Sequence, residues 1–327
     1  MSAVVLADLP SPSPKMLGLA LGFLLDRWWG DPTRGHPVAG FGALATAMER
    51  AMWAPSRRTG TVYTALAVAM PCTAVTFLDR MLRHTQAGRT ALMAGLTWVA
   101  LGGRSLEREG EAIGQLLLVG DLGTARERLP TLVGRDPTGL SEAEVCRAVI
   151  ESVAENTPDA VVGALLWGAI TGPAGVVAYR AVNTLDALVG HRSPRYERFG
   201  WASARLDDVL TWPAARLSAL LAVTLAPVVG GRRGTTWRVL RRDGGAHPSP
   251  NAGRMEAAFA GALDVTLGGT NRYPSHVEHR PHLGDGPAPA PADLRRAVIL
   301  SRAVSRAVVA VGFVVDLAVM TAAARRR

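Results

Sequence analysis

Long uncharged runs alternate along the chain with blocks of charged residues. The clearest run, Thr61–Leu78, contains 18 uncharged residues between two pairs of charged ones. A helix of about this length can cross a bilayer, and Pro71 inside it would kink such a helix without forbidding it. The pattern therefore predicts a membrane-spanning helix over these residues.

Other runs share this pattern less completely. Ala160–Tyr179 is uncharged over 20 residues but is interrupted by Gly172-Pro173. The remaining apolar runs are Leu17–Leu25, Thr90–Gly103, Leu217–Gly231 and Ala303–Ala324. The last of them carries Arg306 and Asp316, so one of its sides must face protein or water. We predict an all-α, polytopic integral membrane protein with about four to six membrane-embedded segments, some of them short or interrupted.

The polar blocks predict amphipathic cytoplasmic helices and one linker. In Arg104–Ser152, Glu, Arg and Ala alternate with Leu at helical spacing. Residues 284–293, GDGPAPAPAD, indicate a Pro-rich linker before the last apolar run. No second self-contained domain is visible, so 1–327 is taken as one membrane domain.

Composition narrows the class of protein. Hydrophobic residues make up 48% of the chain and aromatics only 6%, which favours apolar helices over an aromatic-rich β core. The formal charge of +9 comes almost wholly from Arg, since Lys15 is the only lysine. Arg flanking membrane segments on the cytoplasmic side explains this charge, and no nucleic-acid-binding motif accompanies it. The cysteines, Cys72 and Cys146, cannot form a CxxC metal site.

A first candidate for chemistry is DRWWGDPTRGHP, residues 26–37, which holds Asp26, Asp31 and His36 in a segment broken by Gly and Pro. The alternative is an interfacial loop anchored by Trp28-Trp29.

A second candidate is ESVAENTPD, where Glu151, Glu155 and Asp159 recur every four residues. On one helix the three carboxylates would share a face and repel one another unless a cation lay against them. We therefore predict cation binding here, with a solvated acidic face as the alternative. A different local structure is also open, in which Thr157 caps a new helix that begins at Pro158.

Part of this block occurs twice in the sequence. NTPDAVVG at 156–163 and NTLDALVG at 183–190 share six of eight positions. We interpret both as helix starts, with Thr as the cap and Asp in the first turn, where the helix dipole favours a negative charge. A chance repetition is the alternative.

A third candidate is the segment Tyr179–Asp208, which mixes guanidinium groups with carboxylates and amides. Arginine grips phosphate through two hydrogen bonds, and carboxylate oxygens suit Mg²⁺. The segment contains Arg180, Asn183, Asp186, His191, Arg192, Arg195, Arg205, Asp207 and Asp208. A positively charged cytoplasmic loop is the alternative.

A fourth candidate is His247–Tyr273, which begins with the rigid turn HPSPN. We expect Ser249 or Asn251 to cap a helix that runs to Leu263, with small residues that allow close approach of a neighbour. After it, the pair of glycines at 268–269 predicts a flexible loop with Asn271 and Arg272 as polar groups. The chain contains no P-loop motif.

These blocks together resemble one family. The stretches that carry the resemblance are DRWWGDPTRGHPV, ESVAENTPDAVV, YRAVNTLDALVG, FGWASARLDDVLTW, HPSPNAG and AGALDVTLGGTNRY. They are similar to the cobalamin-biosynthesis membrane proteins called CobD or CbiB, over about residues 17–320. The chain departs from the family pattern at Arg254-Met255 and at Thr211, which affects local packing more than activity.

The resemblance implies adenosylcobinamide-phosphate synthase activity in a bacterial cytoplasmic membrane. Such an enzyme joins adenosylcobyric acid, a corrinoid, to aminopropanol or aminopropanol phosphate as an amide, using ATP and Mg²⁺. Other cobalamin-biosynthesis enzymes are conceivable partners. The alternatives are a transporter for a charged small molecule, because broken helices often bind substrates near the membrane midplane, and a non-catalytic scaffold for cobalamin enzymes.

The candidate residues then receive expected roles. As bases of near-neutral pKa we consider His36, His191 and His247. As metal ligands we consider Glu151, Glu155, Asp159, Asp186, Asp207 and Asp208. As substrate or phosphate contacts we consider Arg180, Asn183, Arg192, Arg195, Arg205, Asn251, Asn271 and Arg272. Asp26 and Asp31 receive no specific role.

Overall fold

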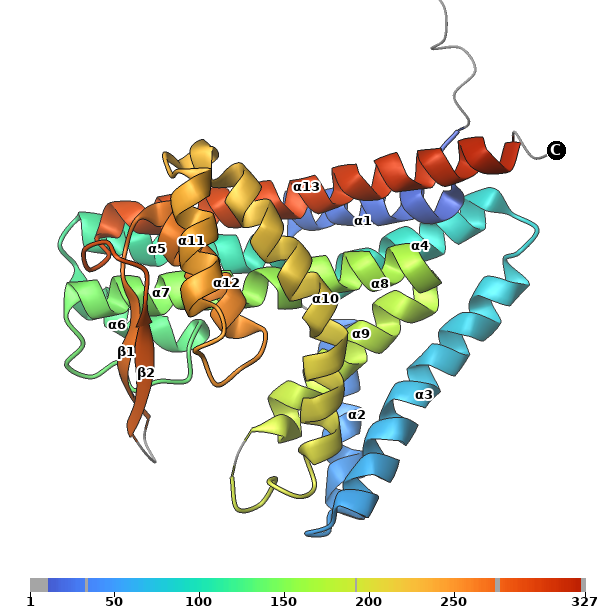
Figure 1. The fold of residues 1–327 in the computed structure, drawn as a ribbon. Helices are drawn as coiled ribbons and strands as arrows, with labels where there is room; N and C mark the ends of the chain where they lie inside the picture. Colours follow the sequence, from blue (N-terminus) through green and yellow to red (C-terminus); the bar gives the residue numbers. More distant parts are fainter. Residues whose placement is uncertain (1–10, 33–34, 192, 274–276, 325–327) are drawn as a thin grey trace, which may run out of the picture. The chain divides into compact units, whose positions relative to one another are not determined.

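The computed structural model describes residues 11–32, 35–191, 193–273 and 277–324, and most of them are helical (Figure 1). The elements are α1 (Pro14–Trp29), α2 (Pro37–Met52), α3 (Arg57–Met81), α4 (Gln86–Ala100), α5 (Gly103–Leu118), α6 (Leu122–Arg128), η1 (Leu129–Thr131), α7 (Glu142–Thr157), η2 (Pro158–Val162), α8 (Gly163–Thr171), α9 (Pro173–Leu185), η3 (Asp186–Gly190), α10 (Trp201–Leu225), η4 (Ala226–Val229), α11 (Arg233–Asp243), α12 (Ala252–Leu263), β1 (Leu267–Arg272), β2 (Val277–Leu283) and α13 (Pro291–Ala324).

The chain divides into two compact units. The first unit comprises Met1–Leu101, Ala164–Ala204 and Arg306–Arg327, and the second comprises Gly102–Gly163 and Arg205–Ser305. The division falls within the helices α10 and α13. Each unit is described by itself below.

Three helices of the described residues are long and apolar enough to cross a membrane: Arg57–Met81, Trp201–Val229 and Pro291–Ala322. They contain the predicted run Thr61–Leu78 and most of the runs Leu217–Gly231 and Ala303–Ala324. On α3 the large exposed apolar side chains are Val62, Leu66, Met70, Phe77, Leu78 and Met81. Such a continuous apolar face is unusual on a water-soluble surface and suits contact with lipid.

The predicted run Ala160–Tyr179 is not one continuous α-helix. It is divided at Gly172, whose backbone has φ 76° and ψ −153°, a conformation that glycine adopts without strain. The chain reverses direction there, between the short helices α8 and α9 (Figure 1). A Cβ on Gly168 of α8 would lie only 2.6 Å from Val176 Cγ2 of α9, so the two helices pack closely as a hairpin. Neither helix has the length of a membrane span.

The repeated NT-x-D sequence does not begin a helix at either copy, which corrects our interpretation. Thr157 ends α7 and leads into the π-helical turn η2, whereas Thr184 lies in α9 just before the π-helical turn η3. Each Thr hydroxyl donates to the carbonyl four residues earlier: Thr157 to Val153 at 2.6 Å and Thr184 to Arg180 at 2.8 Å. The Asp of each copy lies on a π-helical turn, a feature common at functional sites.

The all-α prediction also needs one correction. The predicted flexible loop at 268–273 falls largely within β1, which pairs with β2 as an antiparallel hairpin. Sequence patterns concealed this strand because its two glycines weaken the signal of a strand. Gly268 and Gly269 have φ values of 82° and 92°, and the pairing register shifts between Leu267 and Gly269.

The second unit is built around two helices that are buried on almost every side. In α12 every residue except Arg254 is buried, and α7 is buried continuously from Val145 to Ala154. Small residues permit this: a Cβ on Gly261 would lie 2.8 Å from Thr236 Cα of α11. Polar side chains on α7 and α12 are therefore withheld from water.

Helix contact in the first unit depends on two glycines of α1, four residues apart. A Cβ on Gly22 would lie 2.5 Å from Thr97 Cβ and 2.6 Å from the Ala94 carbonyl oxygen of α4. We expect Gly22→Ala to destabilise the protein by about 1–3 kcal/mol through overpacking and to lower its melting temperature in detergent. Gly95→Ala is the matched control, because no atom lies within 4 Å of its added Cβ. Equal melting temperatures of the two variants would contradict this packing.

Candidate functional site

A buried ion pair joins three segments of the second unit. Arg135, in the loop before α7, donates through Nη2 to Glu151 Oε2 of α7 at 2.6 Å. Its Nη1 donates to Asn271 Oδ1 of β1 at 2.9 Å. The side chains of Arg135 and Glu151 are only 6% and 2% exposed. Because charges so far from water need partners of opposite sign, the pair fixes the loop, α7 and β1 against one another.

The backbone of β1 strengthens this connection. The Gly268 N–H donates to Glu151 Oε1 at 2.8 Å, and the Gly268 carbonyl accepts from Arg147 of α7. Arg147 also donates to the Thr270 carbonyl at 2.9 Å. A Cβ at Gly268 would lie 2.0 Å from the Pro281 carbonyl oxygen, so only glycine fits this contact. Both oxygens of Glu151 are thus occupied by donors of the chain itself.

Glu256, in the middle of α12, is the carboxylate with the fewest compensating contacts. It is fully buried, and neither of its oxygens makes a hydrogen bond to a described residue. The closest cationic groups are His247 Nε2 at 3.7 Å and Arg280 Nη1 at 3.8 Å from Oε1, both beyond hydrogen-bond length. Desolvation, together with the charges of Glu151 and Glu155, raises the pKa of Glu256 well above its ordinary value.

His247 directs an N–H group toward this carboxylate from beyond hydrogen-bond distance. Its Nδ1 accepts from the Ser249 N–H at 2.9 Å, so the proton of the neutral ring belongs on Nε2, the nitrogen nearest Glu256. Burial, and then the charge of Arg280, lower the pKa of His247 and favour this neutral form. The lone pair that a general base needs is therefore already engaged at Nδ1.

Two further groups complete the cluster. Arg280 of β2 donates to Glu278 at 3.1 Å and to the Tyr273 hydroxyl at 3.2 Å, so its charge is already balanced. Glu155 of α7 has an exposed side chain, yet desolvation is the largest effect on its pKa and raises it. Glu155 therefore contacts solvent at a position that is otherwise surrounded by protein atoms.

Other predicted residues of the second unit form a smaller polar group. Asn251 donates to the Asp208 carbonyl of α10 at 2.9 Å and accepts from Arg216 at 2.8 Å. Arg205 lies 3.6 Å from Asp208. The sequence left open whether Ser249 or Asn251 caps α12. Ser249 Oγ accepts from the backbone N–H groups of Asn251 and Ala252, whereas the Asn251 side chain makes no capping hydrogen bond. Asp207 lies on α10, Asp159 on η2 and Arg272 on β1.

The first unit contains the remaining predicted residues, in several places. His36 caps α2, with Nδ1 accepting from the Val38 N–H at 3.1 Å. Arg195 bridges Glu49 at 2.7 Å and covers the Trp53 ring. His191 is exposed and packs edge-on against Tyr196. Asp26 is buried on α1, Asp31 lies in the loop after it, and Asp186 begins η3. Arg192 lies outside the described residues.

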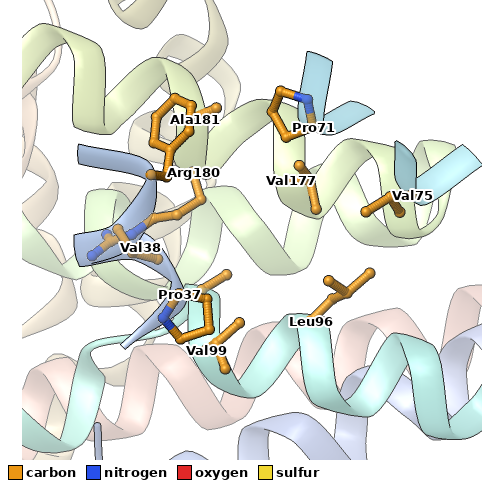
Figure 2. A pocket seen from close by; sticks show the side chains of 11 residues that line it. Pro37, Val38, Pro71, Val75, Leu96, Val99, Val177, Arg180 and Ala181 are labelled. Carbon is orange, nitrogen blue, oxygen red and sulfur yellow. The ribbon is translucent and has the colours of Figure 1, made fainter. Parts of the chain in front are cut away.

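Arg180 and Asn183 of α9 are 3.4 Å apart, and Arg180 lines a pocket of about 190 Å³ (Figure 2). The pocket lies among α2, α3, α4 and α9, and its other lining residues are Pro37, Val38, Phe41, Pro71, Val75, Leu96, Val99, Ala100, Val177 and Ala181. Arg180 is the one charged side chain among the apolar residues that line this pocket, and its predicted contact with substrate or phosphate stays a prediction.

The residues present do not form an evident Mg²⁺ site. Within the described parts of the chain, no three His, Cys, Asp or Glu side chains are gathered as a metal ion requires. Glu151 already accepts from Arg135 and Gly268. The assignment of Mg²⁺ ligands therefore stays a prediction.

Sequence reasoning missed Arg135, Arg147, Glu256 and Arg280. Glu256 did leave a signal, because it is the only acid in the small-residue segment 252–263. Arg135 and Arg147 left none for their contacts with β1, because Asn271 and Gly268 lie more than 100 residues away along the chain.

We predict that the Arg135–Glu151 pair carries much of the stability of the second unit. Arg135→Met leaves a buried carboxylate unpaired and should cost about 3–5 kcal/mol. The double variant with Glu151→Gln should recover part of that loss, as a double-mutant cycle of unfolding in detergent would measure. Arg128→Met is the control, because the Arg128–Glu109 pair is 43% and 28% exposed and should contribute under about 1 kcal/mol. Equal losses for the two arginines would contradict this account.

Comparison with known proteins places these residues in a family context. The family model described as CobD/Cbib protein matches residues 19–301, a range that includes the whole cluster around Glu151 and Glu256. No solved structure matches the chain.

Proteins named "Cobalamin biosynthesis protein CobD" are similar over most of their length. The one from Mycobacterium tuberculosis is 52% identical over 293 residues, covering 89% of this chain and 92% of that protein. The one from Chromobacterium violaceum is 42% identical, covering 87% and 91%. The one from Geobacter metallireducens is 43% identical, covering 84% and 88%. On these matches, the chain belongs to the CobD/Cbib protein family.

Proposed function

We propose that this protein acts in cobalamin biosynthesis as a multi-pass enzyme of the bacterial cytoplasmic membrane. It joins the carboxyl group of adenosylcobyric acid to the amine of aminopropanol or aminopropanol phosphate, with ATP as the energy source. The observation that carries the proposal is the family match over 19–301, supported by relatives named for cobalamin biosynthesis. The buried charged cluster of the second unit supplies groups suited to this chemistry.

Amide formation from a carboxylate requires activation, because its oxygen is a poor leaving group. ATP transfers a phosphoryl group to the carboxylate and leaves ADP. The amine nitrogen then attacks the acyl carbon, the C–O bond to phosphate breaks, and inorganic phosphate leaves. The ammonium form of the amine must lose a proton before it attacks. A site for this reaction thus needs donors for oxyanions and carboxylates for the amine.

The second unit offers both kinds of group. His247 Nε2–H and the Asn271 side-chain amide are buried donors, and neither Nε2 nor Nδ2 makes a hydrogen bond within the described chain. Preorganised donors of this kind stabilise developing negative charge. In the cluster around Glu151, Glu155 and Glu256 accept no hydrogen bond from an arginine among the described residues. No step is assigned to Mg²⁺, since the described carboxylates are not gathered around a metal position.

One observation favours transport as a second candidate. The hairpin of α8 and α9, broken at Gly172, is similar to the interrupted helices that bind substrates in transporters. Detergent-solubilised protein has no compartments to transport between, so formation of a product there would be catalysis.

We expect the purified protein in detergent to form an amide from adenosylcobyric acid, ATP, Mg²⁺ and at least one of the two amines. Mass spectrometry should detect the product, with one ADP and one phosphate released per amide. The reaction without ATP is the control and should give none. Failure to form an amide with either amine, from protein shown to be folded, would refute the ligase proposal.

A further inference from the structure

Within the cluster around Glu151, two carboxylates lack a close arginine partner among the described residues, since Arg280 Nη1 lies 3.8 Å from Glu256 Oε1. Arg135 offsets Glu151, and Arg280 offsets Glu278, at 2.6 and 3.1 Å respectively. The cation of Arg147 is directed at the carbonyl groups of Gly268 and Thr270. Glu155 and Glu256 lack any such partner at hydrogen-bond distance.

Glu256 also lacks the hydrogen-bond donors that a bound ligand would supply. It is fully buried, and neither carboxylate oxygen accepts a hydrogen bond from the described residues. Buried polar groups are nearly always hydrogen-bonded, so each exception calls for an explanation. Glu155, whose charge acts on Glu256, has an exposed side chain, so this end of the cluster is in contact with solvent.

We propose that Glu256, with Glu155 beside it, binds the primary ammonium group of the amine substrate. This inference rests on the proposed ligase function and names the place where one substrate is held. An ammonium group carries three N–H donors and no acceptor, which matches carboxylate oxygens that lack donors.

The neighbouring groups favour an amino alcohol over a metal ion. His247 presents Nε2–H 3.7 Å from Glu256 Oε1, and its Nδ1 is already engaged by the Ser249 N–H. A donor in that position suits the hydroxyl or phosphate-ester oxygen of an amino alcohol, an acceptor that a bare metal ion lacks. The absence of a three-ligand group among the described residues agrees with this choice.

The test compares wild type with Glu256→Gln, which keeps the shape of the side chain and removes its charge. We expect the KM for aminopropanol to rise at least about tenfold, as loss of a charge-assisted hydrogen bond implies, while the KM for ATP stays unchanged. Titration calorimetry with aminopropanol alone should show the same loss of affinity. Glu256→Asp should restore part of the binding. Glu127→Gln, on the exposed face of α6, is the control and should behave as wild type.

The outcomes separate the two proposals. If the wild type forms no amide, the ligase function fails. If the wild type forms amide and folded Glu256→Gln keeps the wild-type KM and affinity for the amine, the inference fails. Binding of Mg²⁺ alone to wild type but not to Glu256→Gln would also overturn it. Should Glu256→Gln not fold, Glu155→Gln decides: a raised KM for the amine is expected, and an unchanged one contradicts the inference.

Discussion

The ion pair of Arg135 and Glu151 is the contact on which the polar interior of the second unit depends. It connects the loop before α7, α7 itself and β1, although Arg135 and Asn271 are 136 residues apart in sequence. A lone charge at this depth would be strongly destabilising, so both partners must be placed together. Gly268, with a backbone that other residues rarely adopt, then brings the hairpin within reach of Glu151.

This arrangement determines the chemistry that remains. Arg135 neutralises Glu151, whereas Glu155 and Glu256 accept no hydrogen bond from an arginine among the described residues. The small residues of α12 let its neighbours approach and exclude water from Glu256. Desolvation and the nearby carboxylates raise its pKa. The fold thus keeps the Glu256 carboxyl group away from water, in a setting where a cationic ligand interacts with its ionised form more strongly than it would in bulk water.

Local patterns predicted the helices, and packing determined the rest. Thr61–Leu78 falls within α3 because apolar length is a local signal. Glu151 and Glu155 do lie on one helix, as their spacing indicated, but the partner of Glu151 is Arg135, which lies in the loop before that helix and carries no spacing signal. The NT-x-D copies were misread because capping rules do not anticipate Thr157 and its counterpart bonding back to an earlier carbonyl. The hairpin was missed because glycine conceals the strand pattern.

The central claim is that the buried carboxyl group of Glu256 binds the ammonium group of the amine, and its raised pKa implies that binding displaces a proton. Infrared difference spectroscopy at mildly acidic pH measures this directly, because a protonated carboxyl group has its own carbonyl stretch. The account predicts that saturating aminopropanol removes such a band from wild type, and that Glu256→Gln lacks the band from the start. A band that persists in amine-saturated, catalytically active wild type would contradict it.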